Sequence, residues 1–597
     1  MERTEGYAPI RDYAAIGDGR TVALVARDGA IDWLCLPDLD SPSVFAAILD
    51  AGAGGRFLLE PETACEATRR YLTGTNVLET TFTTANGSVR VTDAMTLPTR
   101  RLAPYRELVR RVEGLAGRVP IRWTVEPRFG YGTAPTRVRR STVPVVAAGR
   151  DALAVCSWDA GEAECAERTI RGRFVATEGS AGVIALSVAH QEPLVLSSRD
   201  DVEERLQATV RSWRDWTAAR EYDGPWRDAV LRSALALKLL VHAPSGAIAA
   251  AATTSLPEEI GGERNWDYRF SWPRDAAFTL EALLALGCAR EARAFFSWLL
   301  HASQLTHPRL QVLYRLDGRT NADEESLPLA GYRRSRPVRI GNGAAKQTQL
   351  DVYGELLQAA ARFAAFEGGL DRDHGRRLAE IADFVCDVWE RPDAGIWEVR
   401  AEATHFTQSK MMCAVALQRA CELAEHGVIP AKHEVRWRRE QQRVRDFVDT
   451  RCYSERKRSY VRSAEHEDLD ASLLLAVLAG YDEPRSPRLF GTVDAIRREL
   501  GRGPLVHRYV AADGLPGEEG AFLTCSFWLA EAYTRQSRFK EAAALMDDLI
   551  GLANDVGLYA EEIKPDTREF LGNFPQGLTH LALINAAVAL ARAQEQR

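Results

Sequence analysis

The chain has 597 residues, of which 46% are hydrophobic and 27% are charged, and its formal net charge is −7 at pH 7. This length exceeds that of one small domain, and the composition is typical of a globular protein. The negative charge, without a basic run that carries aromatic residues, excludes nucleic acid as an expected partner.

The N-terminal stretch MERTEGYAPIRDYAAIGDGR has no basic segment followed by an apolar core, as a secretory signal would. No apolar run reaches the roughly 18 residues that a membrane span needs. The ten cysteines are scattered from Cys35 to Cys525, without a CxxC pair or a spacing typical of metal ligands. We therefore expect a cytoplasmic protein with reduced thiols, no membrane partner and no bound metal.

Residues 1–200 show the pattern of β-strands. Short runs rich in Val and Thr recur with turn signals between them, which is typical of two packed antiparallel sheets. Asp28-Gly29 and Asn86-Gly87 lie between apolar runs and predict hairpins with type I′ turns. We predict an N-terminal antiparallel β-sandwich, of which the tip at Asp28 and the segment 37–43 could reach a neighbouring site.

Residues 201–222, rich in Glu, Arg and Trp, predict a helical linker. From residue 223 to 597, apolar residues recur at three- and four-residue spacing, as in LAEIADFVCDVW, which indicates helices. We predict helices at 225–241, 275–287, 289–303, 348–366, 374–389, 408–424, 433–451, 469–480, 488–500, 521–536, 538–553 and 578–594. Such a series forms an α-solenoid or a closed ring of six hairpins. The absence of a short repeat and the long charged loops favour the ring, with its loops around a pocket.

Residues 262–276, GERNWDYRFSWPRDA, alternate aromatic rings with charges. A flat ring stacks on the C–H face of a sugar, and a guanidinium beside a carboxylate binds adjacent hydroxyls. The stretch therefore predicts a carbohydrate site. An interface loop with core aromatics and mutually paired charges explains the same composition equally well.

Two further loops carry polar residues. The loop 316–351 is long and dense in Arg, Glu, Asn and Gln, which is more common in functional loops than in solvated surface loops. In DAGIWEVR, residues 393–400, Glu398 directly follows Trp397. An aromatic face desolvates a carboxyl and raises its pKa, as a general acid near neutral pH requires. An exposed Glu on a turn is the alternative.

Two last connections hold carboxylates. Residues 507–528 contain Arg508 and the pair Glu518-Glu519, although acidic residues before a helix are also ordinary capping residues. Residues 557–580 contain Glu561 and Glu562 ahead of GNFPQ, where one carboxylate could be the base for a water molecule. Separated carboxylates, an Arg-Asp pair and aromatics together fit glycoside hydrolysis. The chain lacks HExxH, GxSxG and a Gly-rich phosphate loop, which excludes zinc proteases, serine hydrolases and nucleotide enzymes.

In these stretches the chain resembles glycoside hydrolase family 15, the glucoamylase, glucodextranase and bacterial trehalase group. The resembling blocks, in the family's order, are NWDYRFSWPRDA, GYRRSRPVRIGN, GIWE with HFTQSK, DGLPGEEGAFLTCSFWLAEAY and GNFPQGLTHLALINAA. The segment IGDGRTVALVARDGAIDWLCLPDLDSPSVFAAIL is similar to the β-domain of the trehalase-like branch. The resemblance implies a multi-domain β + α protein: a β-sandwich followed by an (α/α)6 barrel. It also implies an inverting, exo-acting α-glucosidase that releases β-glucose and needs no cofactor.

The resemblance implies catalytic roles for two carboxylates. Glu398 matches the general acid and Glu561 the general base, with the adjacent Glu562 as the alternative base. An inverting reaction needs room for a water molecule, so we expect the two carboxyls to lie about 6.5–9.5 Å apart. Arg274 and Asp275 match the pair that holds the non-reducing glucose.

The resemblance implies binding roles for four more residues. Trp266 and Tyr268 match the aromatics that pack on the first glucose, and Trp397 the wall on the leaving-group side. Arg508 matches the arginine that holds hydroxyls near the cleaved bond. The expected partner is a small α-glucoside, with α,α-trehalose preferred because of the N-terminal segment.

Three alternatives stay open on the sequence alone. Maltose, isomaltose or longer α-glucans would undergo the same chemistry. An inactive carbohydrate-binding protein on the same fold would keep the Arg-Asp pair and the aromatics, but the presence of both carboxylates counts against it. A homo-oligomer is also compatible with the sequence.

Overall fold

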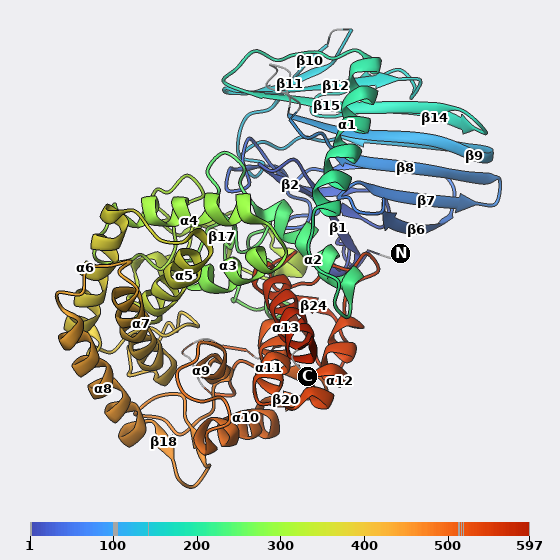
Figure 1. Cartoon of the computed structure of the whole chain (residues 1–597). Helices are drawn as coiled ribbons and strands as arrows, with labels where there is room; N and C mark the ends of the chain where they lie inside the picture. Colours follow the sequence, from blue (N-terminus) through green and yellow to red (C-terminus); the bar gives the residue numbers. More distant parts are fainter. Residues whose placement is uncertain are drawn as a thin grey trace.

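The β-rich N-terminal part is organised around one long strand, β9 (Arg106–Val125), in the computed structural model (Figure 1). The structure describes residues 3–98, 106–140, 142–511, 514, 516–517 and 519–595. The first half of β9 pairs with β8 (Gly87–Met95) and β15 (Ala181–His190). Its second half pairs with β5 (Phe57–Pro61) and β14 (Ile170–Thr177). Two antiparallel sheets therefore share β9.

The other strands extend these two sheets. On one side lie β1 (Tyr13–Gly17), β2 (Val22–Ala26), β3 (Ile31–Cys35), β4 (Ser43–Phe45) and β13 (Glu164–Cys165); on the other lie β6 (Cys65–Tyr71), β7 (Leu78–Thr84), β10 (Arg137–Arg139), β11 (Val145–Ala148) and β12 (Asp151–Trp158). The sheets face each other, because the Tyr71 hydroxyl donates to the Ala15 carbonyl at 2.7 Å and the Arg110 guanidinium lies 4.8 Å from the Phe57 ring centre. The predicted N-terminal antiparallel β-sandwich is confirmed.

Both predicted hairpins are present, but the predicted type I′ turns are wrong. A type I′ turn needs positive φ at both central residues, and neither Asp28 nor Asn86 has it. The Asp28 carboxylate instead accepts the Ala30 N–H at 3.2 Å, within a connection over residues 27–30. In the second hairpin Thr84 pairs with Gly87, so the loop residues are 85 and 86. Side-chain hydrogen bonds to the backbone therefore selected other turns.

Helix α1 (Arg199–Ala218) lies in the predicted linker and packs on the β-sandwich. Ser198 caps it by accepting the Asp201 N–H, in a reciprocal capping box. Arg205 pairs with Glu107 of β9 at 2.6 Å, and both side chains are buried. The division of the chain at 1–200, 201–222 and 223–597 stays a prediction.

Twelve helices follow among the described residues, and they form two concentric rings (Figure 1). The inner helices are α3 (Ala276–Ala285), α5 (Asp351–Glu367), α7 (Thr407–Glu425), α9 (Leu475–Leu478), α11 (Leu523–Arg535) and α13 (Gly577–Glu595). The outer helices are α2 (Arg227–Leu240), α4 (Ala289–Ser303), α6 (Arg372–Val388), α8 (Glu434–Arg451), α10 (Pro487–Leu500) and α12 (Phe539–Ile550). Each inner helix contacts the next, and α13 contacts α3, so the ring closes. This confirms the (α/α)6 barrel.

Burial explains why the helices take these two places. In α7 nearly every residue of the first half is buried, as an inner helix requires. In α8 the buried residues are Trp437, Glu440, Val444 and Val448, a stripe at helical spacing that leaves the other faces to solvent. None of the helices in the described part of the chain is long and apolar enough to span a membrane.

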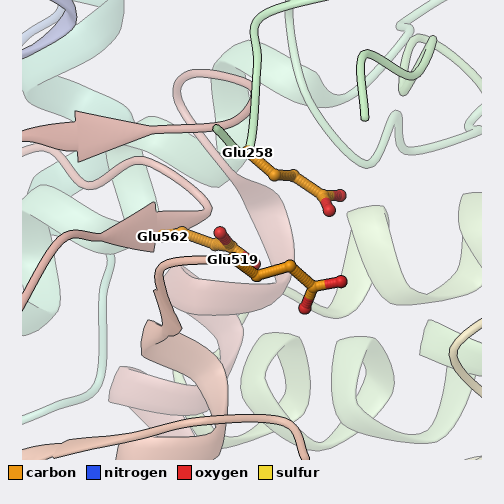
Figure 2. A group of neighbouring side chains, drawn as sticks. All are labelled: Glu258, Glu519 and Glu562. Atoms are coloured by element: carbon orange, nitrogen blue, oxygen red, sulfur yellow. The ribbon is translucent and has the colours of Figure 1, made fainter. Parts of the chain in front are cut away.

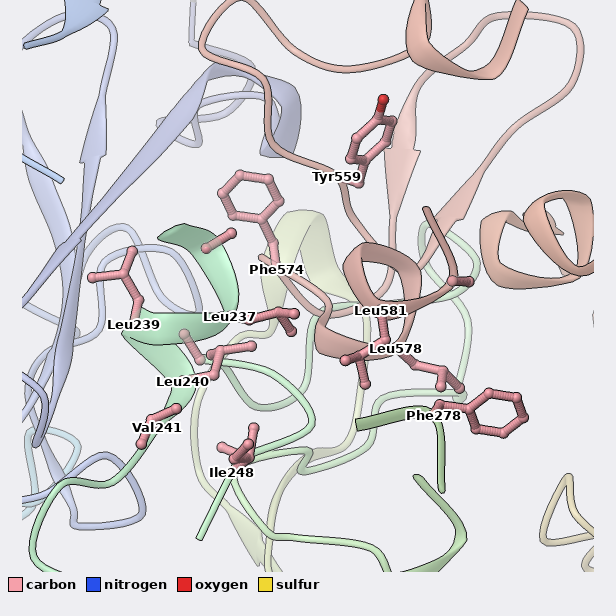
Figure 3. Close-up of a cluster of buried hydrophobic side chains, with 14 of the residues drawn as sticks. Leu237, Leu239, Leu240, Val241, Ile248, Phe278, Tyr559, Phe574, Leu578 and Leu581 are labelled. Atoms are coloured by element: carbon pink, nitrogen blue, oxygen red, sulfur yellow. The ribbon is translucent and has the colours of Figure 1, made fainter. Parts of the chain in front are cut away.

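Buried hydrophobic side chains connect the first and last helices of the ring to the β-sandwich (Figure 3). Leu237 and Leu240 of α2 lie in one cluster with Leu578 and Leu581 of α13. Leu239 faces Gly17 of β1, where a Cβ would come within 3.0 Å of the leucine side chain. The two parts of the chain therefore share one continuous core.

Candidate active site

A pocket of about 720 Å³, its open mouth included, lies where the chain enters four inner helices. The connections before α3, α7, α11 and α13 supply its lining: Ala250, Glu258, Arg264, Trp266, Tyr268, Trp272, Arg274, Asp275, residues 396–400, Arg508, Tyr509, Glu519, Phe522, Gln576 and Leu578. Seven of the eight predicted site residues are in this lining, and the eighth, Glu561, lies next to Tyr268 of the lining. A closed ring of hairpins brings these distant loops to one end.

The stretch before α3 alternates between two environments. Trp266 and Tyr268 line the pocket, whereas Asp267 and Arg269 between and after them are buried on the other side. Arg269 donates to both Asp267 oxygens, at 2.8 and 2.6 Å, and to the Ser41 carbonyl of the β-sandwich at 2.8 Å. The period of two is that of extended backbone. Arg269 and Asp267 thus pair away from the pocket, whereas Arg274 and Asp275 line it, and the carbohydrate site stays a prediction.

Only part of the N-terminal prediction holds. Ser41, within the segment 37–43, contacts Arg269 behind the pocket, but no described residue of that segment lines it. The hairpin tip at Asp28 does not line the pocket either; Asp28 forms a salt bridge with Arg3 at 2.6 Å. The β-sandwich therefore supports the pocket wall from outside.

Glu398 is held against the Arg274–Asp275 pair. Arg274 Nε donates to Asp275 Oδ1 at 2.9 Å, and its Nη1 lies 3.4 Å from Glu398 Oε1. Trp272 Nε1 donates to the same Glu398 oxygen at 2.7 Å. Burial raises the pKa of Glu398, while the Arg274 guanidinium and the Trp272 hydrogen bond oppose that rise. Among the described residues, hydrogen bonds reach only Oε1 of this carboxyl, from Trp272 and Arg274.

The backbone of Glu398 is strained. Its φ of +59° lies in the left-handed region, which costs a non-glycine residue about 1–3 kcal/mol. The turn is fixed by the Glu398 N–H, which donates to the Gly395 carbonyl at 3.2 Å, and by Gln347, which donates to the Glu398 carbonyl at 3.1 Å. Such strain persists where surrounding contacts impose it, as at catalytic residues.

Glu561 lies directly before a short hairpin, β23 (Glu562–Ile563) and β24 (Phe570–Leu571), and is fully buried. Its Oε2 accepts the Asn573 N–H at 3.1 Å. Burial raises the pKa of Glu561 to about 7, opposed by the Arg508 guanidinium and by the hydrogen bond from the Asn573 N–H. A carboxylate with this pKa suits a base that works near neutral pH.

Gly572 leaves the space that Glu561 occupies. A Cβ at Gly572 would lie 2.4 Å from Glu561 Oε2, and its φ is +71°. We expect Gly572→Ala to displace that carboxylate and to lower kcat by about 10²-fold, the effect of an error near 1 Å. The control is Gly427→Ala, which has φ +70° but no neighbour within 4 Å of its Cβ. Equal kcat values for both variants in steady-state assays would contradict this account.

The sequence interpretation missed a group of carboxylates. Glu258, Glu519 and Glu562 lie close together, with one carboxyl oxygen of each within 4.8 Å of the others (Figure 2). Arg508 Nη2 contacts all three, at 2.9, 2.7 and 3.3 Å respectively. For Glu519 the sequence leaves ordinary helix capping open as an explanation, and Glu518 lies outside the described residues. The only sequence signal for Glu258 was its place just before the aromatic stretch.

The long loop 316–351 supports the pocket without lining it, as far as the described residues show. Gln347 holds the Glu398 turn, and Gly341 N–H donates to Asp267 at 3.1 Å. Arg339, together with Arg400 of the neighbouring connection, lies 4.6 Å from the Trp266 ring centre. The loop is therefore structural support for site residues.

Comparison with known proteins places the chain in a family. The family model for glycosyl hydrolases family 15 matches residues 224–588, and that for the trehalase-like N-terminal domain matches residues 3–158. A trehalase of Mycolicibacterium smegmatis is 40% identical over 99% of this chain and 92% of that protein. A trehalase of Thermoplasma volcanium is 34% identical over 99% of this chain and 95% of that protein. The structure of a bacterial glucoamylase complexed with acarbose matches with TM-score 0.72 at 13% identity, over 100% of this chain and 97% of that one.

Proposed function

The chain belongs to glycosyl hydrolases family 15 and is a glycoside hydrolase, and from this premise we propose that it hydrolyses α,α-trehalose by an inverting, exo-acting mechanism. The trehalase names of its relatives and the trehalase-like N-terminal domain support this substrate. The observation that carries the proposal is the position of Glu398, buried in the pocket wall and bonded to Trp272 beside the Arg274–Asp275 pair.

The proposed mechanism assigns one proton transfer to each carboxyl. Protonated Glu398 donates to the glycosidic oxygen as its bond to C1 breaks. Ionised Glu561 removes a proton from the water that attacks C1 from the opposite face, so the configuration inverts. Arg274 and Asp275 hold the first glucose, which makes the attack effectively intramolecular. Trp266, Tyr268 and Trp397 enclose the sugar, and Arg508 holds hydroxyls near the cleaved bond.

The test is a substrate panel of trehalose, maltose, isomaltose and maltotetraose, with the released anomers followed by NMR. Inverting cleavage of trehalose forms one β-glucose at the attacked carbon and one α-glucose from the leaving ring. We therefore expect equal initial amounts of both anomers, from trehalose only. β-Glucose from maltose or longer chains would support the glucoamylase-type alternative. No release from any sugar would support a binding protein on this fold. A cytoplasmic location and a homo-oligomer stay predictions.

The pH dependence tests the assignment of Glu561. Below its pKa the residue is protonated and cannot accept a proton from water, so kcat/KM should fall as the pH drops. Because burial raises the pKa of Glu561 to about 7, we expect the acidic limb near pH 7. Initial rates on the preferred sugar between pH 4 and 9 measure it. An acidic limb at about 4.3, the value of an unperturbed glutamate, would contradict the assignment.

A further inference from the structure

Glu258 is fixed in the pocket wall because the peptide group between Pro257 and Glu258 forms two backbone hydrogen bonds. Its N–H donates to the Arg264 carbonyl at 3.1 Å, which ties it to the aromatic stretch. The carbonyl of the preceding Pro257 accepts the Gly572 N–H at 2.7 Å, which ties it to the hairpin that follows Glu561. These two hydrogen bonds hold Glu258 between the aromatic stretch and the segment that follows Glu561.

One oxygen of this carboxyl is satisfied and the other is not. Oε2 accepts Arg508 Nη2 at 2.9 Å. Oε1 is buried and has no hydrogen-bond partner among the residues that the structure describes, although the side chain is only 1% exposed. A buried polar atom without a partner is costly, so its partner is expected to be a molecule that enters the pocket.

The pocket has two chemically different halves. Glu398, Arg274 and Asp275 form one half, which the proposed mechanism assigns to the first glucose and the departing oxygen. Glu258 and Glu519 line the other half from two different connections, and Arg508 contacts both carboxyls. Figure 2 shows their side chains extending in the same direction. The proposed mechanism assigns neither Glu258 nor Glu519 to the first ring, and Arg508 lies 5.6 Å from the ring centre of Trp397, the residue expected on the leaving-group side.

We propose that Glu258 binds a hydroxyl of the sugar ring on the leaving-group side and so favours a disaccharide over a glucoside with a small leaving group. This inference rests on the proposed function. It makes Glu258 a specificity residue of the second ring, held in place by Arg508.

The charges around Glu258 suit this role. Arg508 faces Glu258, Glu519 and Glu562, and Arg264 pairs with Glu519. Glu561 and Tyr268 are close enough to Glu258 to interact with it electrostatically. Burial raises the pKa of Glu258 to about 8, opposed by Arg508 and supported by Glu561 and Glu519. A neutral carboxyl at pH 7 has an O–H to donate to a sugar oxygen.

The experiment compares two substrates in Glu258→Leu and Glu258→Gln. One is the disaccharide cleaved fastest by the wild type, and the other is α-glucosyl fluoride, whose leaving group is too small to reach the second half of the pocket. In Glu258→Leu we expect kcat/KM on the disaccharide to fall on the order of 10- to 100-fold more than on the fluoride. Glu258→Gln, which keeps a hydrogen-bonding group, should recover part of that difference.

The matched control is Glu355→Gln, which changes a buried glutamate on α5 outside the pocket lining; its Oε2 has no hydrogen-bond partner in the described part of the chain. It should change both rates by the same factor. Equal losses on both substrates in the Glu258 variants, or no loss, would overturn the inference. If Glu258→Leu does not fold, the test uses Glu258→Gln alone: a larger loss of kcat/KM on the disaccharide than on the fluoride supports the inference, and equal losses overturn it.

Failure of the proposed function would look different. A folded wild-type protein that cleaves neither substrate refutes that function, and calorimetry with trehalose and glucose then decides on Glu258. Weaker binding of trehalose but not of glucose in Glu258→Gln would support the inference. Equal binding of both by wild type and variant would overturn it.

Discussion

Replacement of Glu398 by Gln is expected to lower kcat on the disaccharide by about 10²–10⁴-fold, the usual contribution of a general acid. Gln keeps the shape of the side chain and can still accept the Trp272 N–H. The fall in kcat therefore measures the contribution of the proton that Glu398 donates. Without a proton on the departing oxygen, the leaving glucose must depart as an alkoxide. Steady-state rates of glucose release, with thermal unfolding as the check on the fold, measure the effect.

The nature of the leaving group provides the control for Glu398→Gln. Fluoride departs without a strong requirement for protonation, so the loss on α-glucosyl fluoride should be at least tenfold smaller than on the disaccharide. The alkaline limb of the pH profile should also disappear. Glu390→Gln, at a side chain 61% exposed on the outer surface, should keep both activities. Equal losses on the two substrates would show that Glu398 is not the acid.

Replacement of Glu561 by Gln is expected to lower kcat by about 10²–10⁴-fold on both the disaccharide and α-glucosyl fluoride. Attack by water needs a base whatever the leaving group, so kcat should fall on the fluoride as much as on the disaccharide. The substrate dependence therefore separates this residue from Glu398. Rates on both substrates, measured at the same pH above 7, check the prediction.

Glu562→Gln is the matched control, because the adjacent residue is also fully buried. Glu562 Oε2 accepts the Gly520 N–H at 2.9 Å and its Oε1 lies 3.3 Å from Arg508, so both oxygens have structural contacts. Glu561 instead contacts Tyr268 of the pocket lining. We expect Glu562→Gln to lose less kcat than Glu561→Gln. The reverse order would identify Glu562 as the base.

The supporting contacts have a consequence for engineering this protein. Arg269 joins the aromatic stretch to the β-sandwich through Asp267 and Ser41, and Gln347 holds the strained turn at Glu398. Substitutions far from the sugar can thus alter catalysis by moving the residues that touch it. The β-sandwich is part of the machinery that positions the pocket wall.

The sequence by itself determined the architecture. Period-two and helical patterns gave the β-sandwich and all twelve helices, because burial of one face imposes a period that is local and readable. Five ordered blocks indicate the family, and seven of the eight site residues predicted from the resemblance line one pocket. Their roles in catalysis stay predictions until the variants above are assayed.

The tertiary structure decided which charges meet. Arg508 and Glu258 are 250 positions apart, and only ring closure brings them to 2.9 Å, so no local pattern could mark Glu258. Likewise, only the fold shows that Arg269 pairs with Asp267 away from the pocket, while Arg274 faces Glu398 inside it. The left-handed φ of Glu398 also depends on a distant contact, because Gln347 donates to the Glu398 carbonyl from 51 positions away. Sequence periodicity reports which face is buried, whereas pairing depends on which distant faces meet.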